Sequence, residues 1–434
     1  MDIKDLYELF LRHPEVTTDT RHCPADSLFF ALRGATFDGN AFAAAALEAG
    51  CAYAVVDDPS VPVGGDGRYI LVDDVLATLQ RLATEHRRRL GTRIVQITGT
   101  NGKTTTKELT AAVLRGRYNV LATEGNFNNH IGVPKTLLRL RPEHELAVVE
   151  TGANHPGEIA SLSAIVEPDC GLITNVGRAH LEGFGSFDGV VHTKGELYDW
   201  LRRSPEGFIF LHKGDTVLEG IAGSLPRFTY GEPGLGCDVE GEVTACAPFL
   251  RLRWRPAGGT WHEVQTHLIG AYNLWNVLAA VAVGMRFGVE PARITSALES
   301  YVPSNSRSEL RQTDRNTLIV DAYNANPTSM KAALDNFALI PHPHKMVILG
   351  DMRELGEASA EEHRRVAARA GALGCEAVWL VGPEFASCEL PCSRHFASVD
   401  EVKAAIAGGE RPEGRLILIK GSNGTHLFEL PDLL

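Results

Sequence analysis

The chain lacks three features that would place it outside the cytoplasm. Its eight cysteines form no C-x-x-C pair, and the closest two are Cys388 and Cys392, so neither a disulfide framework nor a zinc site is indicated. No apolar run is long enough to span a membrane. The segment from Met1 to Asp5 does not have the composition of a signal peptide. We therefore expect a cytoplasmic protein with free thiols and no membrane insertion.

The chain also lacks an excess of positive charge, and it contains no short-period repeat or low-complexity tract. Its 54 acidic and 42 basic residues give a formal net charge of −12. Nucleic acid is therefore not an expected partner, because binding it requires clustered lysine and arginine. Local basic sites for the phosphates of small molecules remain compatible with this charge.

The order of apolar segments predicts an α/β protein of three domains. A length of 434 residues corresponds to about three domains of ~150 residues each. We expect a small α/β domain at 1–90, a central parallel-sheet domain at 91–302 and a C-terminal Rossmann-like domain at 303–434, because apolar strands alternate with helical segments. In residues 237–268, by contrast, polar residues alternate with apolar ones such as valine and tryptophan over short stretches, which predicts an antiparallel region.

A helix is predicted at the end of the first domain, from Leu79 to Leu90. It carries three consecutive arginines, Arg87, Arg88 and Arg89. Such a run most often lies on a solvated helix face, so we expect these side chains to face water.

The strongest functional signal is a glycine loop within residues 94–105, R-I-V-Q-I-T-G-T-N-G-K-T. A buried-strand pattern precedes the loop and a helix pattern follows it. Glycines let backbone N–H groups converge on phosphate oxygens, Lys103 can meet the β/γ charge, and the Thr104 hydroxyl can ligate Mg²⁺. The loop is shorter than the usual G-x-x-x-x-G-K-[ST], because Ile97 stands where the first glycine is expected. A chance glycine loop is the alternative, but the order of elements favours a nucleoside triphosphate site.

Polar residues after later strands are candidates for the same site. Glu150 ends a strand, where a carboxylate beside a phosphate loop can ligate Mg²⁺, although it can also be an ordinary polar strand end. His180 lies in a glycine-rich turn, and spacing alone does not separate a ligand from a structural or solvated histidine. Lys194 and Glu196 lie on a predicted helix and, taken alone, would be a solvated charge pair.

Several segments together resemble the Mur ligase family, ATP-dependent enzymes that add amino acids to the cell-wall precursor. The segments shared with the family in general are 98–104, 175–186, 194–196 and 273–276. Those that resemble the branch adding D-alanyl-D-alanine are 123–134, 321–327 (D-A-Y-N-A-N-P) and 349–356 (L-G-D-M-R-E-L-G). The resemblance covers all three predicted domains, and the last two segments are the most specific.

The resemblance implies roles in holding ATP and magnesium. The residues implied to contact the nucleotide are Gly99, Thr100, Asn101, Gly102, Lys103, Thr104, Thr105, Asn273, Asn276, Arg307, Asp321 and Asn324. Those implied to hold two Mg²⁺ ions are Thr104, Glu150, His180 and Lys194. Those implied to be catalytic are Lys103, His180, Lys194 and Arg307. Lys194 would act as a carbamate, and Arg307 would reach the γ-phosphate from the third domain.

The resemblance also implies the substrates, UDP-N-acetylmuramoyl-tripeptide and D-alanyl-D-alanine, and a monomeric enzyme. The implied substrate-binding residues are Thr20, Arg33, Gly34, Asp38, Asn126, Asn128 and Asn129. Two positions depart from the family pattern. Ser306 precedes Arg307 where glycine is more frequent, and Asn423 follows Lys420-Gly421-Ser422 where arginine is frequent. A phosphate or carboxylate contact by an arginine is therefore not expected at Asn423.

The implied reaction converts the peptide carboxylate into an acyl phosphate, which the dipeptide amine then attacks, giving UDP-N-acetylmuramoyl-pentapeptide for peptidoglycan synthesis. Lys103, Arg307 and Mg²⁺ would offset the repulsion between the carboxylate and ATP. The alternatives are another Mur ligase, a folylpolyglutamate synthase, a motor-like or signalling NTPase, and a nucleotide-gated binding protein with a degenerate site. The third residue of the peptide, diaminopimelate or lysine, stays open at this point.

Overall fold

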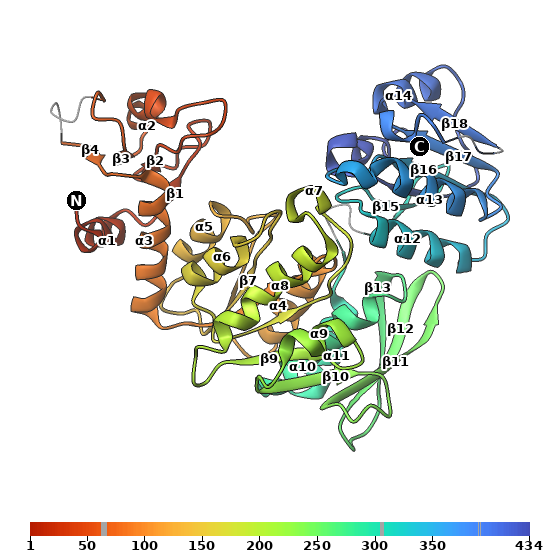
Figure 1. Ribbon diagram of the computed structural model, residues 1–434, viewed down its shortest axis with the longest axis horizontal. Helices are drawn as coiled ribbons and strands as arrows, with labels where there is room; N and C mark the ends of the chain where they lie inside the picture. Colours follow the sequence, from red (N-terminus) through yellow and green to blue (C-terminus); the bar gives the residue numbers. More distant parts are fainter. Residues whose placement is uncertain (62–66, 304–307, 389, 391) are drawn as a thin grey trace.

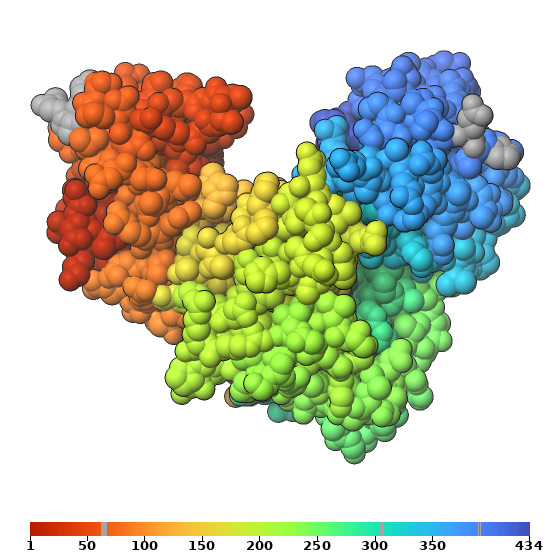
Figure 2. All heavy atoms as spheres, viewed as in Figure 1, coloured from red at the N-terminus to blue at the C-terminus, as the bar shows by residue number. Residues whose placement is uncertain are grey.

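The computed structural model describes the chain except for residues 62–66, 304–307, 389 and 391. Within the described residues, the strands form three sheets of four, nine and six strands. The sheets follow one another along the chain, from the red and orange N-terminal domain through the central domain to the blue C-terminal domain (Figure 1). The two outer domains rise on either side of the central domain and leave a hollow between them (Figure 2).

The N-terminal domain is built on a four-stranded parallel sheet in the order β1-β2-β3-β4. Its elements are α1 (Ile3–Arg12), β1 (Val16–Thr17), β2 (Leu28–Phe30), a 3-10 turn (Gly39–Phe42), α2 (Ala43–Glu48), β3 (Tyr53–Val56), β4 (Tyr69–Leu71) and α3 (Val75–Leu90). Successive side chains of a strand face opposite sides. Phe29 accordingly packs with α2, whereas Leu28 and Phe30 pack with α1 and α3.

The central domain contains a nine-stranded sheet in the order β13-β12-β11-β10-β9-β8-β5-β7-β6. Its strands are β5 (Arg93–Thr98), β6 (Val120–Ala122), β7 (Leu146–Glu150), β8 (Cys170–Ile173), β9 (Phe208–His212), β10 (Arg227–Gly231), β11 (Val239–Cys246), β12 (Phe249–Pro256) and β13 (His262–Ile269). The strands from β6 to β11 pair in parallel, and β11, β12 and β13 pair antiparallel, as the alternation in 237–268 predicts.

Helices cover both faces of this sheet. They are α4 (Lys103–Arg115), α5 (Gly132–Leu138), α6 (Glu158–Val166), α7 (Leu181–Phe184), α8 (Phe187–Leu201), α9 (Thr216–Ala222), α10 (Asn273–Arg286) and α11 (Pro291–Ser300). One hydrophobic cluster joins one face to α4, α10 and α11, and another joins the opposite face to α5, α6 and α8. Burial on both faces explains why these strands are near-continuous apolar runs.

The C-terminal domain is a six-stranded sheet in the order β14-β15-β19-β16-β17-β18, of which only β14 is antiparallel. Its elements are β14 (Glu309–Gln312), β15 (Thr317–Asp321), α12 (Pro327–Leu339), β16 (Lys345–Gly350), α13 (Ser359–Gly371), β17 (Ala377–Val381), β18 (Ser393–Phe396), α14 (Val399–Ala407) and β19 (Leu416–Lys420). Helices α12 and α13 pack on one face, and α14 packs on the other. The expected α/β class with a doubly wound third domain is therefore confirmed, while the domain bounds stay a prediction.

Helix α3 connects the N-terminal and central domains and shares its packing between them. It begins after Asp74, whose carboxylate accepts a hydrogen bond from Ala77 N at 2.8 Å, and ends at Gly91 with a left-handed φ of 67°. Leu79 and Leu82 are fully buried in a cluster that runs from α1 through α3 to α5, α6 and α8. The two domains therefore have one continuous core on this side.

The last turn of α3 is fastened to the end of α6, so the expected exposure is wrong for Arg87. Its Nε donates to Val166 O at 3.1 Å, and its Nη2 donates to Glu167 O at 2.5 Å and lies 3.3 Å from Asp169 Oδ2. Val166 O and Glu167 O are among the carbonyls that the C-terminus of α6 leaves without partners. Arg88 pairs with Glu167 and Arg89 with Glu85 at the exposed surface.

No described helix combines the length and the apolar character that crossing a bilayer would require.

We predict that Arg87→Ala lowers the free energy of unfolding by about 1–3 kcal/mol, because it leaves part-buried carbonyls without donors. The measurement is the urea midpoint of the transition that reports on α3. Arg89→Ala is the control, since Arg89 pairs with Glu85 of its own helix at the surface, and its effect on the urea midpoint should be clearly smaller. Equal shifts for the two variants would contradict the fastening role of Arg87.

Candidate active site

A cavity of about 1000 Å³ lies between the central and C-terminal domains. The central domain contributes the loop after β5, the ends of β7 and β8, and the start of α10. The C-terminal domain contributes Asp321 at the end of β15, Lys420 at the end of β19 and the first turn of α12. All of these strands end at the cavity, which is where doubly wound sheets bind ligands.

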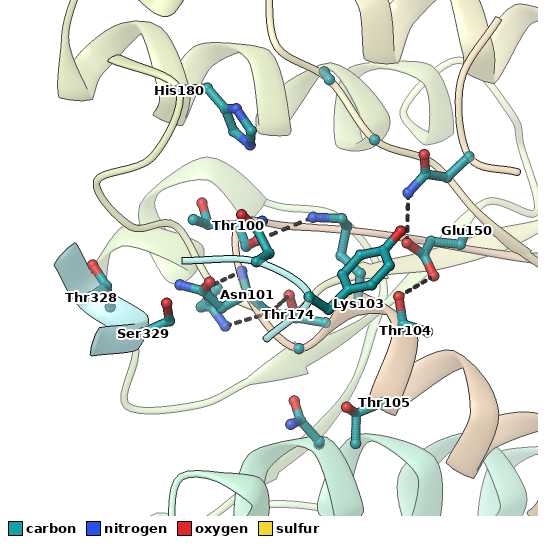
Figure 3. A pocket seen from close by; sticks show the side chains of 18 of the residues that line it. Thr100, Asn101, Lys103, Thr104, Thr105, Glu150, Thr174, His180, Thr328 and Ser329 are labelled. Atoms are coloured by element: carbon teal, nitrogen blue, oxygen red, sulfur yellow. Dashed lines mark hydrogen bonds between the residues drawn. The ribbon is translucent and has the colours of Figure 1, made fainter. Parts of the chain in front are cut away.

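The glycine loop forms the floor of this cavity, and its glycines are required by shape (Figure 3). Gly99 and Gly102 have φ of 140° and 78°, in the region that favours glycine. A Cβ on Gly99 would lie 2.1 Å from Thr174 Oγ1, and one on Gly102 would lie 2.5 Å from Asn276 Oδ1. Helix α4 starts at Lys103, so its positive N-terminal end faces the loop.

Two residues that sequence reasoning did not assign to the site hold the loop in place. Asn175 Oδ1 accepts from Asn101 N at 3.1 Å, and its Nδ2 donates to Asn101 O at 2.9 Å. Thr174 Oγ1 donates to the same carbonyl at 2.6 Å. Both residues follow β8 directly, so a polar pair after a buried strand was the available signal. Lys103 Nζ donates to Gly99 O and Thr100 O at 2.9 and 3.0 Å.

Oxygen atoms gather at the end of β7, beside the loop. Thr104 Oγ1 donates to Glu150 Oε2 at 2.9 Å, and Asn128 Nδ2 donates to Glu150 Oε1 at 2.8 Å (Figure 3). The Glu150 residue is only 1% exposed. A buried carboxylate with a hydroxyl on the phosphate loop is the donor set that suits Mg²⁺. The geometry thus fits the metal roles predicted for Thr104 and Glu150.

His180 lies on the cavity wall opposite the loop (Figure 3). It precedes the short helix α7 with a left-handed φ of 52°. Its Nδ1 is hydrogen-bonded to the Glu354 carboxylate of the C-terminal domain. Burial lowers the pKa of His180, and the carboxylate of Glu354 opposes that shift. The neutral ring is the form that can ligate a metal ion.

Lys194 and Glu196 are both buried in α8, so the expectation of a solvated charge pair is wrong. Glu196 accepts from Gly157 N and Ala160 N at 2.8 Å, where its carboxylate caps the N-terminus of α6. Lys194 is 2% exposed. Its Nζ donates to Ala153 O at 3.3 Å and lies 5.3 Å from the Phe184 ring centroid. Ala153 lines the cavity, so Lys194 stands directly behind the wall.

The environment of Lys194 disfavours its ammonium form. Burial, reinforced by the nearby charge of Lys103, lowers the pKa of Lys194 to about 7. Among the described residues no carboxylate forms an ion pair with it. Nor do three His, Cys, Asp or Glu side chains gather as a metal site in the described chain. This agrees with the predicted ligand set, in which Glu150 and His180 are joined by a threonine and a lysine.

The remaining predicted nucleotide residues line the same cavity. Asn273 and Asn276 are buried at the start of α10, and Asn276 Oδ1 accepts from Thr106 Oγ1 at 3.0 Å. Asp321 lies 2.5 Å from Lys420 Nζ, which also donates to Asn324 O at 3.2 Å. Arg307 and Ser306 lie outside the described residues.

The predicted substrate-binding residues fall into two groups. Asn128 and Asn129 line the cavity, whereas Asn126 does not. Thr20, Arg33, Gly34 and Asp38 lie in the N-terminal domain, away from the cavity lining. The Asp38 carboxylate caps the turn at Asn40, and Arg33 Nε lies 3.0 Å from Asp57 Oδ1.

Asn326 of the 321–327 segment was expected near the nucleotide, and its Nδ2 donates to Asn101 Oδ1 at 2.7 Å, which joins α12 to the phosphate loop. Other residues line the cavity but were given no role from the sequence. Thr328 and Ser329 follow Asn326 in the chain and face the loop from the other domain (Figure 3). His212 and Trp275 form an aromatic wall with ring centroids 4.0 Å apart. These pairings join distant parts of the chain, so no local pattern indicates them.

Comparison with known proteins assigns the family. Residues 14–87 match the Mur ligase family catalytic domain, 97–284 the Mur ligase middle domain and 306–423 the Mur ligase glutamate ligase domain. The UDP-N-acetylmuramoyl-tripeptide–D-alanyl-D-alanine ligase of Bacillus subtilis is 37% identical over 96% of this chain and 92% of its own length. The chain belongs to the Mur ligase family. The predicted resemblance is confirmed.

Solved structures of Mur ligases match this one over nearly its whole length. MurF from Acinetobacter baumannii superimposes with a TM-score of 0.86 at 32% identity, covering 96% of this chain and 93% of that chain. MurF ligase from Thermotoga maritima in complex with ADP gives 0.84 at 25% identity, covering 98% and 97%. Mur ligases depend on ATP, and the alternative of another Mur ligase or a folylpolyglutamate synthase is not favoured.

We predict that Lys103→Ala lowers kcat by about 10³-fold or more, because the variant would lack the ammonium expected to stabilise charge on the transferring phosphoryl group. ATP-dependent phosphate release measures this, and circular dichroism checks that the fold persists. Lys331→Ala, on the exposed face of α12 beside Asp335, is the control and should keep the parent's turnover. A folded Lys103→Ala enzyme with near-normal turnover would contradict the phosphate-loop assignment.

Proposed function

We propose that this Mur ligase joins D-alanyl-D-alanine to UDP-N-acetylmuramoyl-tripeptide at the expense of ATP. The observation that carries the proposal is the position of the D-A-Y-N-A-N-P segment, 321–327. The cavity beside the phosphate loop is lined by Asp321, Tyr323 and Asn324. Asn326 donates a hydrogen bond to Asn101 of that loop. The segment that the sequence ties to dipeptide addition thus lies at the phosphate-loop cavity, which supports the proposal.

The first step is transfer of the γ-phosphoryl group to the terminal carboxylate of the tripeptide. Both reactants are anionic, so the site must supply positive charge. Lys103, the N-terminus of α4 and Arg307 provide it. The amine of the dipeptide then forms a bond to the acyl carbon, loses its proton and displaces phosphate. Closure of the third domain over the cavity would exclude water from the acyl phosphate.

Thr104, Glu150, His180 and Lys194 are proposed to hold two Mg²⁺ ions. When bound, magnesium supplies charge neutralisation and alignment for the phosphate oxygens. The hydrogen bond between Thr104 and Glu150 supports one set of ligands. His180 would ligate the metal through Nε2 while its Nδ1 keeps the hydrogen bond to Glu354.

Lys194 is proposed to react with CO₂ to form a carbamate. A lysine with a pKa of about 7 is largely neutral at slightly alkaline pH. The neutral amine attacks the carbon of CO₂, which forms an N–C bond and releases one proton. The product is an anion that can bind a metal ion, in place of a buried ammonium that no carboxylate of the described residues pairs with. The reaction therefore removes the free-energy penalty of burying that ammonium.

The N-terminal domain is proposed to bind the UDP-sugar, with Thr20, Arg33, Gly34 and Asp38 as its contacts. Asn128 and Asn129 lie on the cavity wall, where they could guide the peptide toward the phosphate loop, and Asn126 precedes them. We also propose a monomer that works in the cytoplasm. The absence of a C-x-x-C pair among the eight cysteines supports a reducing compartment.

Phosphate release from ATP tests the proposed function directly. We expect release only when UDP-N-acetylmuramoyl-tripeptide and D-alanyl-D-alanine are both present, because the acyl phosphate turns over by transfer to the amine. Release without the dipeptide, or none with both substrates, would contradict the proposal. Comparing lysine- and diaminopimelate-containing tripeptides then defines the third residue.

We predict that Lys194→Arg lowers activity by ~100-fold or more, because a guanidinium keeps its positive charge and does not readily form the carbamate. Lys194→Glu should retain part of the magnesium dependence, since it restores an anionic oxygen on a shorter stem. Magnesium titrations of activity distinguish the two variants. Lys403→Arg, at an exposed ion pair with Glu429, is the control. Parental activity in Lys194→Arg would rule out the carbamate.

A further inference from the structure

The dipeptide substrate of the proposed function carries a free carboxylate, which calls for a cation at its binding site. Lys420 does not meet this need, because it is buried at 2% exposure and pairs with Asp321 at 2.5 Å. The neighbouring strand β16 leads into the loop 351–356 at the same edge of the sheet. This loop carries a second cation, Arg353.

The Arg353 guanidinium lies over the backbone of Gly424. Its Nη2 donates to Gly424 O at 3.2 Å. A Cβ on Gly424 would lie 2.9 Å from Arg353 Nε and 3.0 Å from its Cζ, so the missing side chain makes room for the guanidinium. Among the described residues no carboxylate pairs with Arg353, which is exposed. Most of its hydrogen-bond donors therefore remain available, and the adjacent Asn423 is uncharged.

The loop that carries Arg353 is held rigidly. Asp351 is 5% exposed, and its Oδ2 accepts from Glu384 N at 3.2 Å. Met352 N donates to His363 Nε2 at 3.0 Å, and Arg353 N donates to Ser422 Oγ at 3.2 Å. A fixed backbone lowers the entropy lost when a side chain binds a ligand.

The same loop lies beside the predicted reaction centre. Glu354 is hydrogen-bonded to His180 of the cavity wall, and Glu354 O accepts from Glu182 N at 3.3 Å. The loop thus rests against α7, which approaches the C-terminal domain in Figure 1. Arg353 directly precedes Glu354, so it belongs to the loop that contacts the cavity wall at His180.

We propose that Arg353 binds the terminal carboxylate of D-alanyl-D-alanine and so orients its amine toward the acyl carbon. The inference rests on the proposed function. A guanidinium binds a carboxylate through two parallel hydrogen bonds, which fixes direction as well as position. The charge of this one side chain then selects dipeptides that end in a free acid.

The test compares two acceptors, D-alanyl-D-alanine and its C-terminal amide, in the parent enzyme and in Arg353→Gln. We expect the parent to prefer the acid by ~10–100-fold in kcat/KM, because this is the discrimination that one charge-assisted hydrogen-bonded pair provides. In Arg353→Gln this preference should fall to within about threefold. The KM values for ATP and UDP-N-acetylmuramoyl-tripeptide should stay unchanged. Arg364→Gln, an exposed arginine of α13, is the control.

Gly424→Ala provides a second, independent variant. It keeps Arg353 but places a methyl group where the guanidinium lies, and Gly424 has no left-handed φ that alanine would strain. We expect its preference for the acid to fall by at least threefold, because the flexible end of Arg353 must move. Unaltered discrimination in Arg353→Gln, or an equal loss of ATP or UDP-tripeptide affinity, would overturn the assignment. Absence of dipeptide-dependent turnover in the parent would instead contradict the proposed function.

Discussion

The polarity of two parallel sheets determines where the chemistry of this protein can occur. In the central domain β5, β7 and β8 end beside one another, which brings together the phosphate loop, Glu150 and the anchor Asn175. In the C-terminal domain β15 and β19 end at Asp321 and Lys420. Because both edges face one cavity, short polar segments after buried strands become a single site. The helices on both faces of each sheet contribute mainly by keeping those edges in register.

Much of the fold could be predicted because the signals are local. The strand before the glycine loop and the alternating strands near 237–268 are each encoded in consecutive residues. Helices α1 and α14 and the edge strands β14 and β18 were not predicted. The strands have only four residues each. Their pairing depends on neighbours supplied by other parts of the chain.

The candidate site divides in the same way. The roles of Gly99 and Gly102 follow from the loop sequence, because close approach and positive φ both require glycine. The burial of Lys194 and of Arg87 could not be predicted, since charged residues on amphipathic helices usually face water. Lys194 packs against Phe184 of α7, the short helix that precedes its own helix in the chain. Arg87 packs against the end of α6, which is far from it in sequence. Burial by tertiary contact, and not local helix preference, lowers the pKa of Lys194.

The shared packing of α3 has a mechanical consequence. Turning the N-terminal domain against the central domain would expose leucine side chains of α3, at ~25 cal/mol for each Å² of apolar surface. The C-terminal domain has two cores, and one of them also includes Ile269 of β13 in the central domain. It meets the phosphate loop and α7 mainly through a few polar contacts, such as that between Asn326 and Asn101. The N-terminal and central domains therefore form one body through α3. A ligand seated on the first domain would keep a constant distance from the phosphate loop.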